Sequence, residues 1–255
     1  KPGAGLSEIR GPLAVEGLLD VQGSARWATS AEALTNRGKI RLPFGGRLQV
    51  SAPLVQAGGT LQVEGGELVL SQGLSLEDGT LIAAGILSGH LTNGALAVVD
   101  QEQPGRVRGE WTQTSKGTLQ VRVRETSVAS DVALQVSGPL NLRGTLEVVL
   151  ADGVLLSRGA VLRLVKADSL NGWFERLVLP PLEAGLHWQV VPSEDQVCLS
   201  VRDTPPPVLI EWVQRVSGDR VRVSGPWSLE TKAVLRISHD LRNWTTVERK
   251  SPFVG

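Results

Sequence analysis

The sequence feature that most constrains the fold is a glycine-punctuated repeat between Gly58 and Val99. Alternating apolar and polar residues fill the intervals, which are 7, 7, 6 and 6 residues long between Gly59, Gly66, Gly73, Gly79 and Gly85. Three intervals make about 20 residues, one turn of a coil built from three short strands. The repeat predicts an all-β fold, a parallel β-helix (a three-strand-per-turn β-solenoid) over residues 1–201.

Side-chain alternation along each strand predicts which residues face the inside of the coil. The inward set is aliphatic: Leu61, Val63, Leu68, Leu70, Leu74, Leu76, Leu81 and Ala83. Parallel strands stack about 4.8 Å apart, so Leu61 is expected over Leu81. The repeat glycines are expected to adopt positive φ at corners. A β-sandwich is the alternative, but its turn signals come about every 8–12 residues.

Two stretches interrupt the strand pattern. Residues 28–36 (ATSAEALTN) are the one place where a helical turn or two is expected, as a cover for the open end of the coil. Residues 100–109 (DQEQPGRVRG), with Pro104 and Gly105, predict a polar loop that protrudes between turns. Such a loop is either a plain connection or a carrier of binding function.

The aromatic residues allow two interpretations. Trp173, Phe174 and Trp188 cluster near the end of the predicted coil, where large rings suit the plugging of its last turn, with carbohydrate stacking as the alternative. The remaining tryptophans are either core residues or a platform for sugar rings: Trp27, Trp111, Trp212, Trp227 and Trp244.

A proline-rich linker, residues 202–207 (RDTPPP), separates the coil from a small β-sandwich-like module at residues 208–255. Successive prolines favour extended polyproline II and cannot join a sheet interior. The module is expected to hold short strands at residues 208–213, 220–224, 233–238, 245–249 and 253–254. It is small for a sandwich, which typically takes about 100 residues, so it is expected to be completed either by packing on the coil or by a strand from elsewhere.

Composition limits the partners and cofactors. Lys plus Arg (26) equals Asp plus Glu (26), so no nucleic-acid partner is expected. No window of about 18 apolar residues predicts a membrane span. The single cysteine, Cys198, is interpreted as a core-strand residue, and the three histidines (His90, His187 and His239) are too scattered for a zinc site. No metal or cofactor is predicted.

Catalytic machinery is not predicted either. The outward acidic and basic candidates stand singly, as on a solvated strand face: Glu64, Glu67, Glu77, Asp78, Arg122, Arg124, Glu125 and Glu147. His187 and Asp195 are close in sequence, but no nucleophile motif accompanies them. No phosphate-binding glycine loop is present. We therefore expect no enzyme, with a polysaccharide lyase or hydrolase as the least favoured alternative.

Ordered motifs in the C-terminal half carry a family resemblance. They are residues 117–121 (GTLQV), 134–138 (LQVSG), 142–150 (LRGTLEVVL), 162–165 (LRLV), 171–174 (NGWF), 179–182 (LPPL) and 185–188 (GLHW). This series resembles the closing end of the β-helix in bacterial autotransporter-like surface proteins with β-strand repeats. Residues 238–244 (SHDLRNW) are similar to small C-terminal modules of the same class. The resemblance implies an extracellular or cell-surface setting.

The resulting function hypothesis is a structural subunit of an extracellular fibre or surface coat. Open ends of a coil invite association, and a head-to-tail contact that does not close makes a filament. The expected partner is therefore a second copy of the chain. A surface adhesin or glycan-binding module is the alternative, with surface glycans as its partners.

Overall fold

The structure is a computed structural model that describes residues 7–10, 14–28, 33–124, 132–191, 193–203, 212–217, 220–224, 233–237 and 245–250. The chain divides into two compact units, Lys1–Arg202 and Asp203–Gly255. All regular structure in the described residues is β, as expected, and none of them is helical. None of them accordingly forms a helix suited to crossing a membrane.

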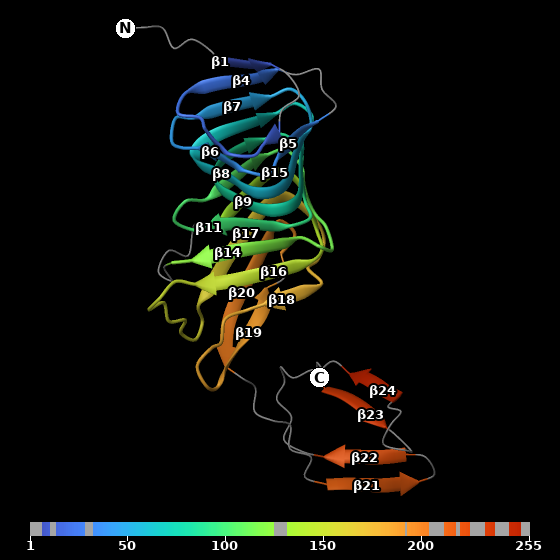
Figure 1. Cartoon of the computed structure of the whole chain (residues 1–255). Coiled ribbons are helices and arrows are strands. Elements are labelled where there is room, and N and C mark those ends of the chain that lie inside the picture. The colour runs from blue at the N-terminus through green and yellow to red at the C-terminus, as the bar shows by residue number, and fades with distance from the viewer. Residues whose placement is uncertain are drawn as a thin grey trace. The chain divides into compact units, whose positions relative to one another are not determined.

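The described residues up to Asp203 form strands β1 to β20, stacked in rows (Figure 1). The first ten are β1 Ser7–Arg10, β2 Ala14–Val15, β3 Leu18–Asp20, β4 Ser24–Ala28, β5 Leu34–Asn36, β6 Lys39–Leu42, β7 Arg47–Val50, β8 Leu54–Leu70, β9 Leu74–Ser88 and β10 Leu91–Asn93. The next ten are β11 Leu96–Asp100, β12 Gly105–Arg108, β13 Trp111–Gln113, β14 Thr118–Val123, β15 Leu134–Leu142, β16 Thr145–Leu150, β17 Val161–Gly172, β18 Arg176–Val178, β19 Leu186–Val191 and β20 Gln196–Asp203.

Parallel pairing links strands that are three apart in sequence order. β1 pairs with β4, β2 with β5, β3 with β6 and β4 with β7. The long strands β8 and β9 turn corners, so β8 alone lies beside β5, β6 and β7. In the same way β9 lies beside β10, β11 and β12. One long strand thus takes the place of three short ones.

Corner-turning strands also close a ring. β9 pairs with β10, β10 with β13, β13 with β15, β15 with β12, and β12 with β9, all in parallel. The ring closes because β9 and β15 each extend across more than one face. On each face the hydrogen bonds connect one row of strands to the next, and the interior is left to side chains.

Aliphatic columns fill the core. Leu61 lies in register with Leu81, 20 positions further along, as predicted. The same column runs through six strands, and every member is fully buried: Ile40, Leu61, Leu81, Ala97, Leu119 and Leu146. The other predicted inward residues of β8 and β9 are also buried. Each buried leucine contributes about 1.5–3 kcal/mol relative to an exposed one.

The repeat glycines have two different physical roles. Gly79 has a φ of 78°, and an added Cβ would lie 2.5 Å from the carbonyl oxygen of Gly59. The prediction of positive φ is also right for Gly59 and Gly73, but wrong for Gly66 and Gly85. Gly85 is required for space, since an added Cβ would lie 2.6 Å from the Gly66 carbonyl oxygen.

Both predicted interruptions need correction. Residues 34–36 form strand β5 and Ala28 ends β4, so the expected helical turns are wrong there; residues 29–32 lie outside the described part. The predicted loop at 100–109 shortens to residues 101–104, because Gly105–Arg108 is strand β12 with Val107 buried. Tertiary pairing with β9 and β15 draws this polar sequence into the sheet.

The parallel pattern ends at β20, which pairs with β17 in the antiparallel sense. Phe174 is buried in the core near this end, and Trp188 packs against the core while its indole donates to the Pro180 carbonyl at 2.9 Å. Trp173 contacts Phe174 edge-on but stays 37% exposed. Core packing is therefore confirmed for Phe174, and for Trp188 in part.

The second unit contributes two antiparallel hairpins: β21 Trp212–Ser217 with β22 Arg220–Ser224, and β23 Ala233–Ile237 with β24 Thr245–Lys250. The expected strands near residues 220, 233 and 245 are confirmed within a residue of their ends. Strand β21 overlaps the expected strand 208–213 at residues 212–213 and continues to Ser217. Residues 208–211 and 253–254 lie outside the described part.

Candidate functional site

An outward-facing column of side chains crosses the sheet. It consists of residues in direct register on seven neighbouring strands: Arg47, Glu67, Ile86, Arg106, Gln135, Lys166 and Gln196. They point outward because the residue after each of them, such as Val107 beside Arg106, is buried in the core. We call this set the outer column.

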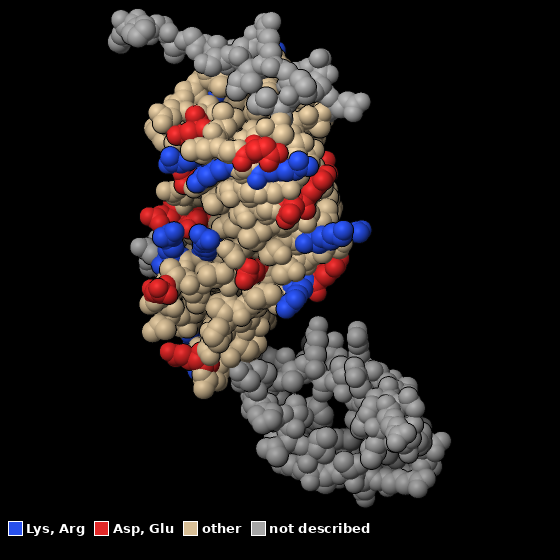
Figure 2. Space-filling view, viewed as in Figure 1, with Lys and Arg blue, Asp and Glu red and all other residues tan. Residues whose placement is uncertain are grey.

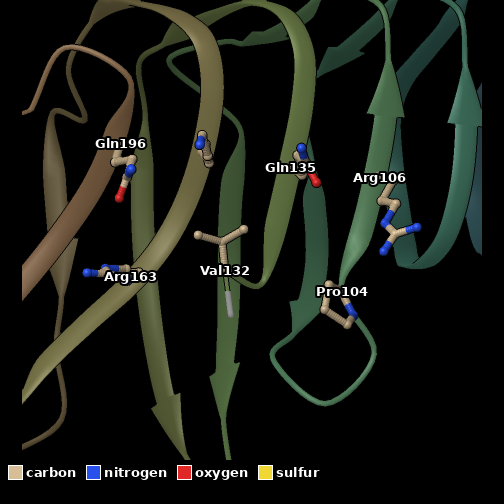
Figure 3. A pocket seen from close by; sticks show the side chains of 7 residues that line it. Pro104, Arg106, Val132, Gln135, Arg163 and Gln196 are labelled. Carbon is tan, nitrogen blue, oxygen red and sulfur yellow. The ribbon is translucent and has the colours of Figure 1, made fainter. Parts of the chain in front are cut away.

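A pocket of about 530 Å³ opens over the far half of the outer column (Figure 3). It is lined by Pro104, Arg106, Val132, Gln135, Arg163, Lys166 and Gln196. Pro104 lies on the connection before β12, and the charged and amide side chains come from the neighbouring strands β12, β15, β17 and β20. Three of the described lining residues are cations, two are amides and none is an acid.

A β-bulge creates this cation cluster. Residues three apart in a regular strand point to opposite faces, yet Arg163 and Lys166 are both exposed. The register of β17 against β20 shifts between Arg163 and Val165, and Leu164 and Val165 are both buried. Bulges re-aim side chains in this way, and here the bulge brings Arg163 to the same pocket as Lys166.

A second pocket of about 570 Å³ adjoins the first and shares Pro104 and Arg106 with it. Phe44 is 90% exposed and lies over Gly65, where an added Cβ would come 3.2 Å from the ring. The acid in its described lining, Glu64, is paired with Arg41 at 3.0 Å. We call the two adjoining pockets together the outer groove. From the Phe44 turn to β20, their lining residues span six strand spacings, about 29 Å.

The cations of the groove differ in their pairing from several other basic residues of the surface. Arg47 and Arg108 both contact Glu67, at 3.5 and 3.7 Å, and Arg124 contacts Asp100 at 2.8 Å. Within the described part of the chain, Arg106, Arg163 and Lys166 make no ion pair or hydrogen bond. On the face shown in Figure 2, acidic and basic side chains are interspersed, so no large area carries one sign of charge.

The predicted outward acids do not converge. Glu64 and Glu67 are ion-paired, Asp78 accepts from the Gly79 amide, and Glu147 accepts from Gln120 at 2.8 Å. Glu77 accepts from Ser75, and Arg122 donates to Gln120. Glu125 lies outside the described residues. His187 and Asp195 are not hydrogen-bonded to each other, since Asp195 accepts from Ser193 and His187 Nδ1 has no partner.

Of the five tryptophans considered as a sugar-binding platform, two have side chains that the structure describes. Trp27 and Trp111 are completely buried, so both are core residues and the sugar-platform interpretation is wrong for them. The side chains of Trp212, Trp227 and Trp244 lie outside the described part. The exposed aromatic ring of the groove is Phe44, which sequence analysis missed because a lone phenylalanine beside Gly45 and Gly46 gives no periodic signal.

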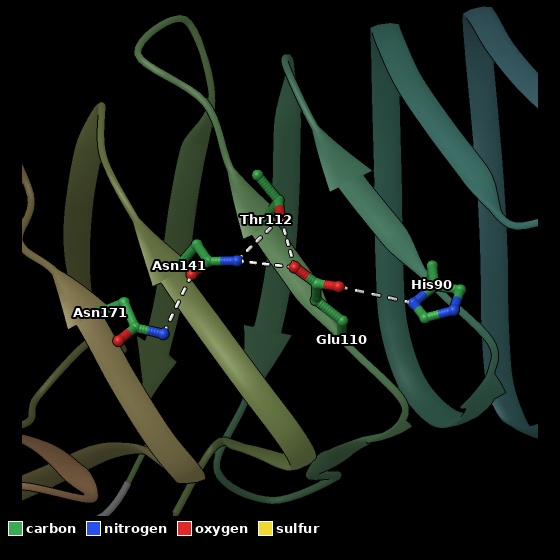
Figure 4. A network of polar contacts seen from close by, with 5 residues as sticks. All are labelled: His90, Glu110, Thr112, Asn141 and Asn171. Atoms are coloured by element: carbon green, nitrogen blue, oxygen red, sulfur yellow. Dashed lines mark hydrogen bonds and ion pairs between the residues drawn. The ribbon is translucent and has the colours of Figure 1, made fainter.

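A polar network lies on another part of the outer surface (Figure 4). Glu110 accepts from Asn141 at 2.8 Å and lies 3.7 Å from His90 Nδ1, and Asn171 donates to Asn141 at 3.1 Å. Asn141 and Asn171 belong to β15 and β17, and His90 and Glu110 directly precede β10 and β13, so we interpret the network as a ladder that joins successive rows. No group of His, Cys, Asp or Glu in the described residues is arranged to hold a metal.

Cys198 is a buried residue of β20, as predicted, and burial raises the pKa of its thiol. Asp195, beside the groove, has a pKa below its ordinary value, chiefly because Ser193 donates to its carboxylate, with a smaller contribution from the charge of Lys166.

Comparison with known proteins gives no family for this chain: no family model matches it, and no curated protein matches it. The outer groove is therefore interpreted from its own chemistry.

Proposed function

We propose that the first unit is a parallel β-helix with three strands per turn, and that the protein is an extracellular or cell-surface binding module, an adhesin for extended glycans. The pairing of strands three apart and the 20-position register of Leu61 with Leu81 support the fold. The resemblance of residues 117–201 to autotransporter-like surface proteins supports the setting.

One observation carries the function: the outer groove crosses successive strands, and in its far half each strand presents a polar side chain, from Arg106 through Gln135 and Lys166 to Gln196. An extended ligand lying across these strands meets a hydrogen-bonding group at each of them. Amides such as Gln135 and Gln196 hydrogen-bond hydroxyl groups, and the exposed ring of Phe44 offers an apolar face to a sugar ring.

The proposed function is binding of a glycan without cleavage. Glycoside hydrolysis needs two carboxyl groups facing one bond. Among the described residues of the groove, Glu64 is the one lining acid, and Arg41 already pairs with it. The groove therefore offers contacts for holding a chain and lacks, in its described lining, an acid and base pair for cutting it.

A glycan array probed with the full chain tests the proposal. We expect retention on at least one extended glycan and no release of reducing ends after prolonged incubation. Retention with product release would instead favour a lyase or hydrolase. Absence of retention on every extended glycan would overturn the adhesin proposal.

A second candidate is the structural subunit that assembles end to end. It is favoured by the first row of strands, because β1, β2 and β3 pair on one side, with β4, β5 and β6, and have no partner on the other among the described residues. At the opposite end, antiparallel β20 covers β17 and reduces the parallel edge that a copy would need. Electron microscopy and sedimentation at high protein concentration test assembly: end-to-end rods support it, and dispersed monomers contradict it.

A further inference from the structure

We propose that the outer groove binds an acidic polysaccharide, whose carboxylate or sulfate groups are held by Arg106, Arg163 and Lys166. This inference rests on the proposed glycan-binding function and names the ligand class. The cations line one pocket of about 530 Å³ without an acid in its described lining. Guanidinium groups bind carboxylate and sulfate-like oxygens through paired, charge-assisted hydrogen bonds.

The groove cations carry charge that no acidic side chain neutralises by an ion pair in the described structure. The surface basic residues Arg41, Arg47, Arg108 and Arg124 each face a carboxylate within 4 Å. The three groove cations instead have no ion pair or hydrogen bond within the described structure, and all three line the same pocket. An anion entering that space gains hydrogen bonds without first breaking an ion pair.

The groove cations are separated by amide residues along the outer column. Arg106 and Lys166 are two strands apart in the outer column, with Gln135 between them and Gln196 after Lys166. The backbones that carry the two cations are therefore about 10 Å apart, and an amide occupies each intervening or following position. Cation and amide alternate, which complements a polymer whose charged units alternate with neutral, hydroxyl-bearing units.

The same pattern disfavours a nucleic acid, which carries a phosphate on every unit and is held by many basic contacts. The groove offers three cations, and Glu64 and Glu67 stand near its other half. The chain as a whole has no net charge. An acidic polysaccharide with sparse charges matches this arrangement better.

Asp195 limits the positive field of the groove. Its carboxylate is close enough to Lys166 for that charge to lower its pKa, although the hydrogen bond from Ser193 is the larger cause. Asp195 is next to Gln196 of the pocket lining. Replacing it with the neutral isostere, Asp195→Asn, is therefore expected to tighten binding of an anionic chain.

The test measures binding of the full chain to four probes: polygalacturonate (carboxylate), heparin (sulfate), dextran (neutral) and single-stranded oligothymidylate (phosphate). We expect binding to one or both acidic polysaccharides that weakens as salt rises, with dextran and the oligonucleotide at least about tenfold weaker. The carboxylate and sulfate arms distinguish the two sources of negative charge.

Matched charge-removal variants locate the site. The double variant R106Q/K166Q should weaken binding by at least about tenfold, since it removes two of the three positive charges that would form charge-assisted hydrogen bonds with the anionic groups. The control R143Q/K116Q removes one arginine and one lysine that are also exposed but lie outside the groove, and it should bind as the parent does. Thermal unfolding verifies that both variants stay folded.

The outcomes separate the inference from the function on which it rests. Equal binding of dextran and acidic chains, unchanged in R106Q/K166Q, would overturn the acidic-ligand inference and leave glycan binding intact. Preferential binding of the oligonucleotide would overturn the inference in favour of a nucleic acid. Failure to bind any polysaccharide, here and on the glycan array, would overturn both.

Discussion

Asn93 donates from Nδ2 to the Oε1 of Gln113 at 2.7 Å, and both side chains lie inside the core in direct register. The same relationship recurs between Asn36 and Gln56, also at 2.7 Å and also 20 positions apart. Buried amides need hydrogen-bond partners. Each pair supplies one such bond by stacking one turn of chain on the next, while Asn36 Oδ1 and Gln113 Nε2 remain without a partner. These pairs help to fix the register of the rows.

Asn93→Ala is expected to lower the free energy of unfolding by about 1–3 kcal/mol, because buried groups lose their partners. Asn93 also donates to the Thr118 carbonyl and accepts from the Ala95 amide. Chemical denaturation measures the loss, with exposed Thr92→Ala on the same strand as a control near zero. In a double-mutant cycle with Gln113→Ala, fully additive losses would contradict the coupling.

Trp111→Ala is expected to cost about 3–5 kcal/mol, since the ring is completely buried and its removal leaves a cavity. Trp173→Ala should cost clearly less, because that ring is 37% exposed. Urea denaturation of the two variants under identical conditions compares them. Equal losses would argue against the core position of Trp111.

Gly79→Ala is expected to cost more than about 1 kcal/mol, because the residue combines positive φ with a close carbonyl. The matched control is Gly23→Ala, where φ is not in the left-handed region and no atom lies within 4 Å of the added Cβ. The control should be neutral or slightly stabilising. Thermal melts of both variants report the difference, and similar melting temperatures would contradict the corner geometry.

Cys198 should react slowly with a thiol reagent in the folded protein and quickly in denaturant, because the thiol is buried. Burial raises its pKa in the folded state, so the unfolded chain releases the thiol proton at lower pH. The free energy of unfolding should therefore hold steady below the ordinary thiol pKa and fall as pH rises above it. Denaturation at stepped pH measures this effect, which Cys198→Ser should lack; an identical fall in that variant would exclude the thiol as its source.

The aliphatic repeat made much of the core predictable. Alternation alone placed Leu61, Val63, Leu81 and Ala83 inside, because a strand has only two faces and the apolar one must leave water. Sequence analysis missed the buried amides, although the phrase Leu-Thr-Asn occurs at residues 34–36 and again at 91–93. Polar residues in a short strand normally indicate the outer face. Here a hydrogen bond to an amide one turn away offsets the free-energy cost of burying them.

The outer groove was harder to predict from the sequence than the core. Residues 100–109 drew attention as a protruding loop, and Pro104 and Arg106 do line the pockets, but most of the loop is absent because Gly105–Arg108 joins the sheet. The other cations come from β17, about 60 positions further along the chain. No local sequence pattern indicates that these residues lie close together.

Local sequence by itself determined most of the strands, the inward faces of the central repeat and the stacking interval, because these follow from side-chain alternation and from where glycine allows a corner. The tertiary structure alone decided the groove. Arg163 and Lys166 share a face because a bulge opposite β20 breaks the alternation between them. Arg106 joins them because β15 lies between β12 and β17. A local pattern specifies how a strand is built, whereas the meeting of distant side chains depends on which strands become neighbours.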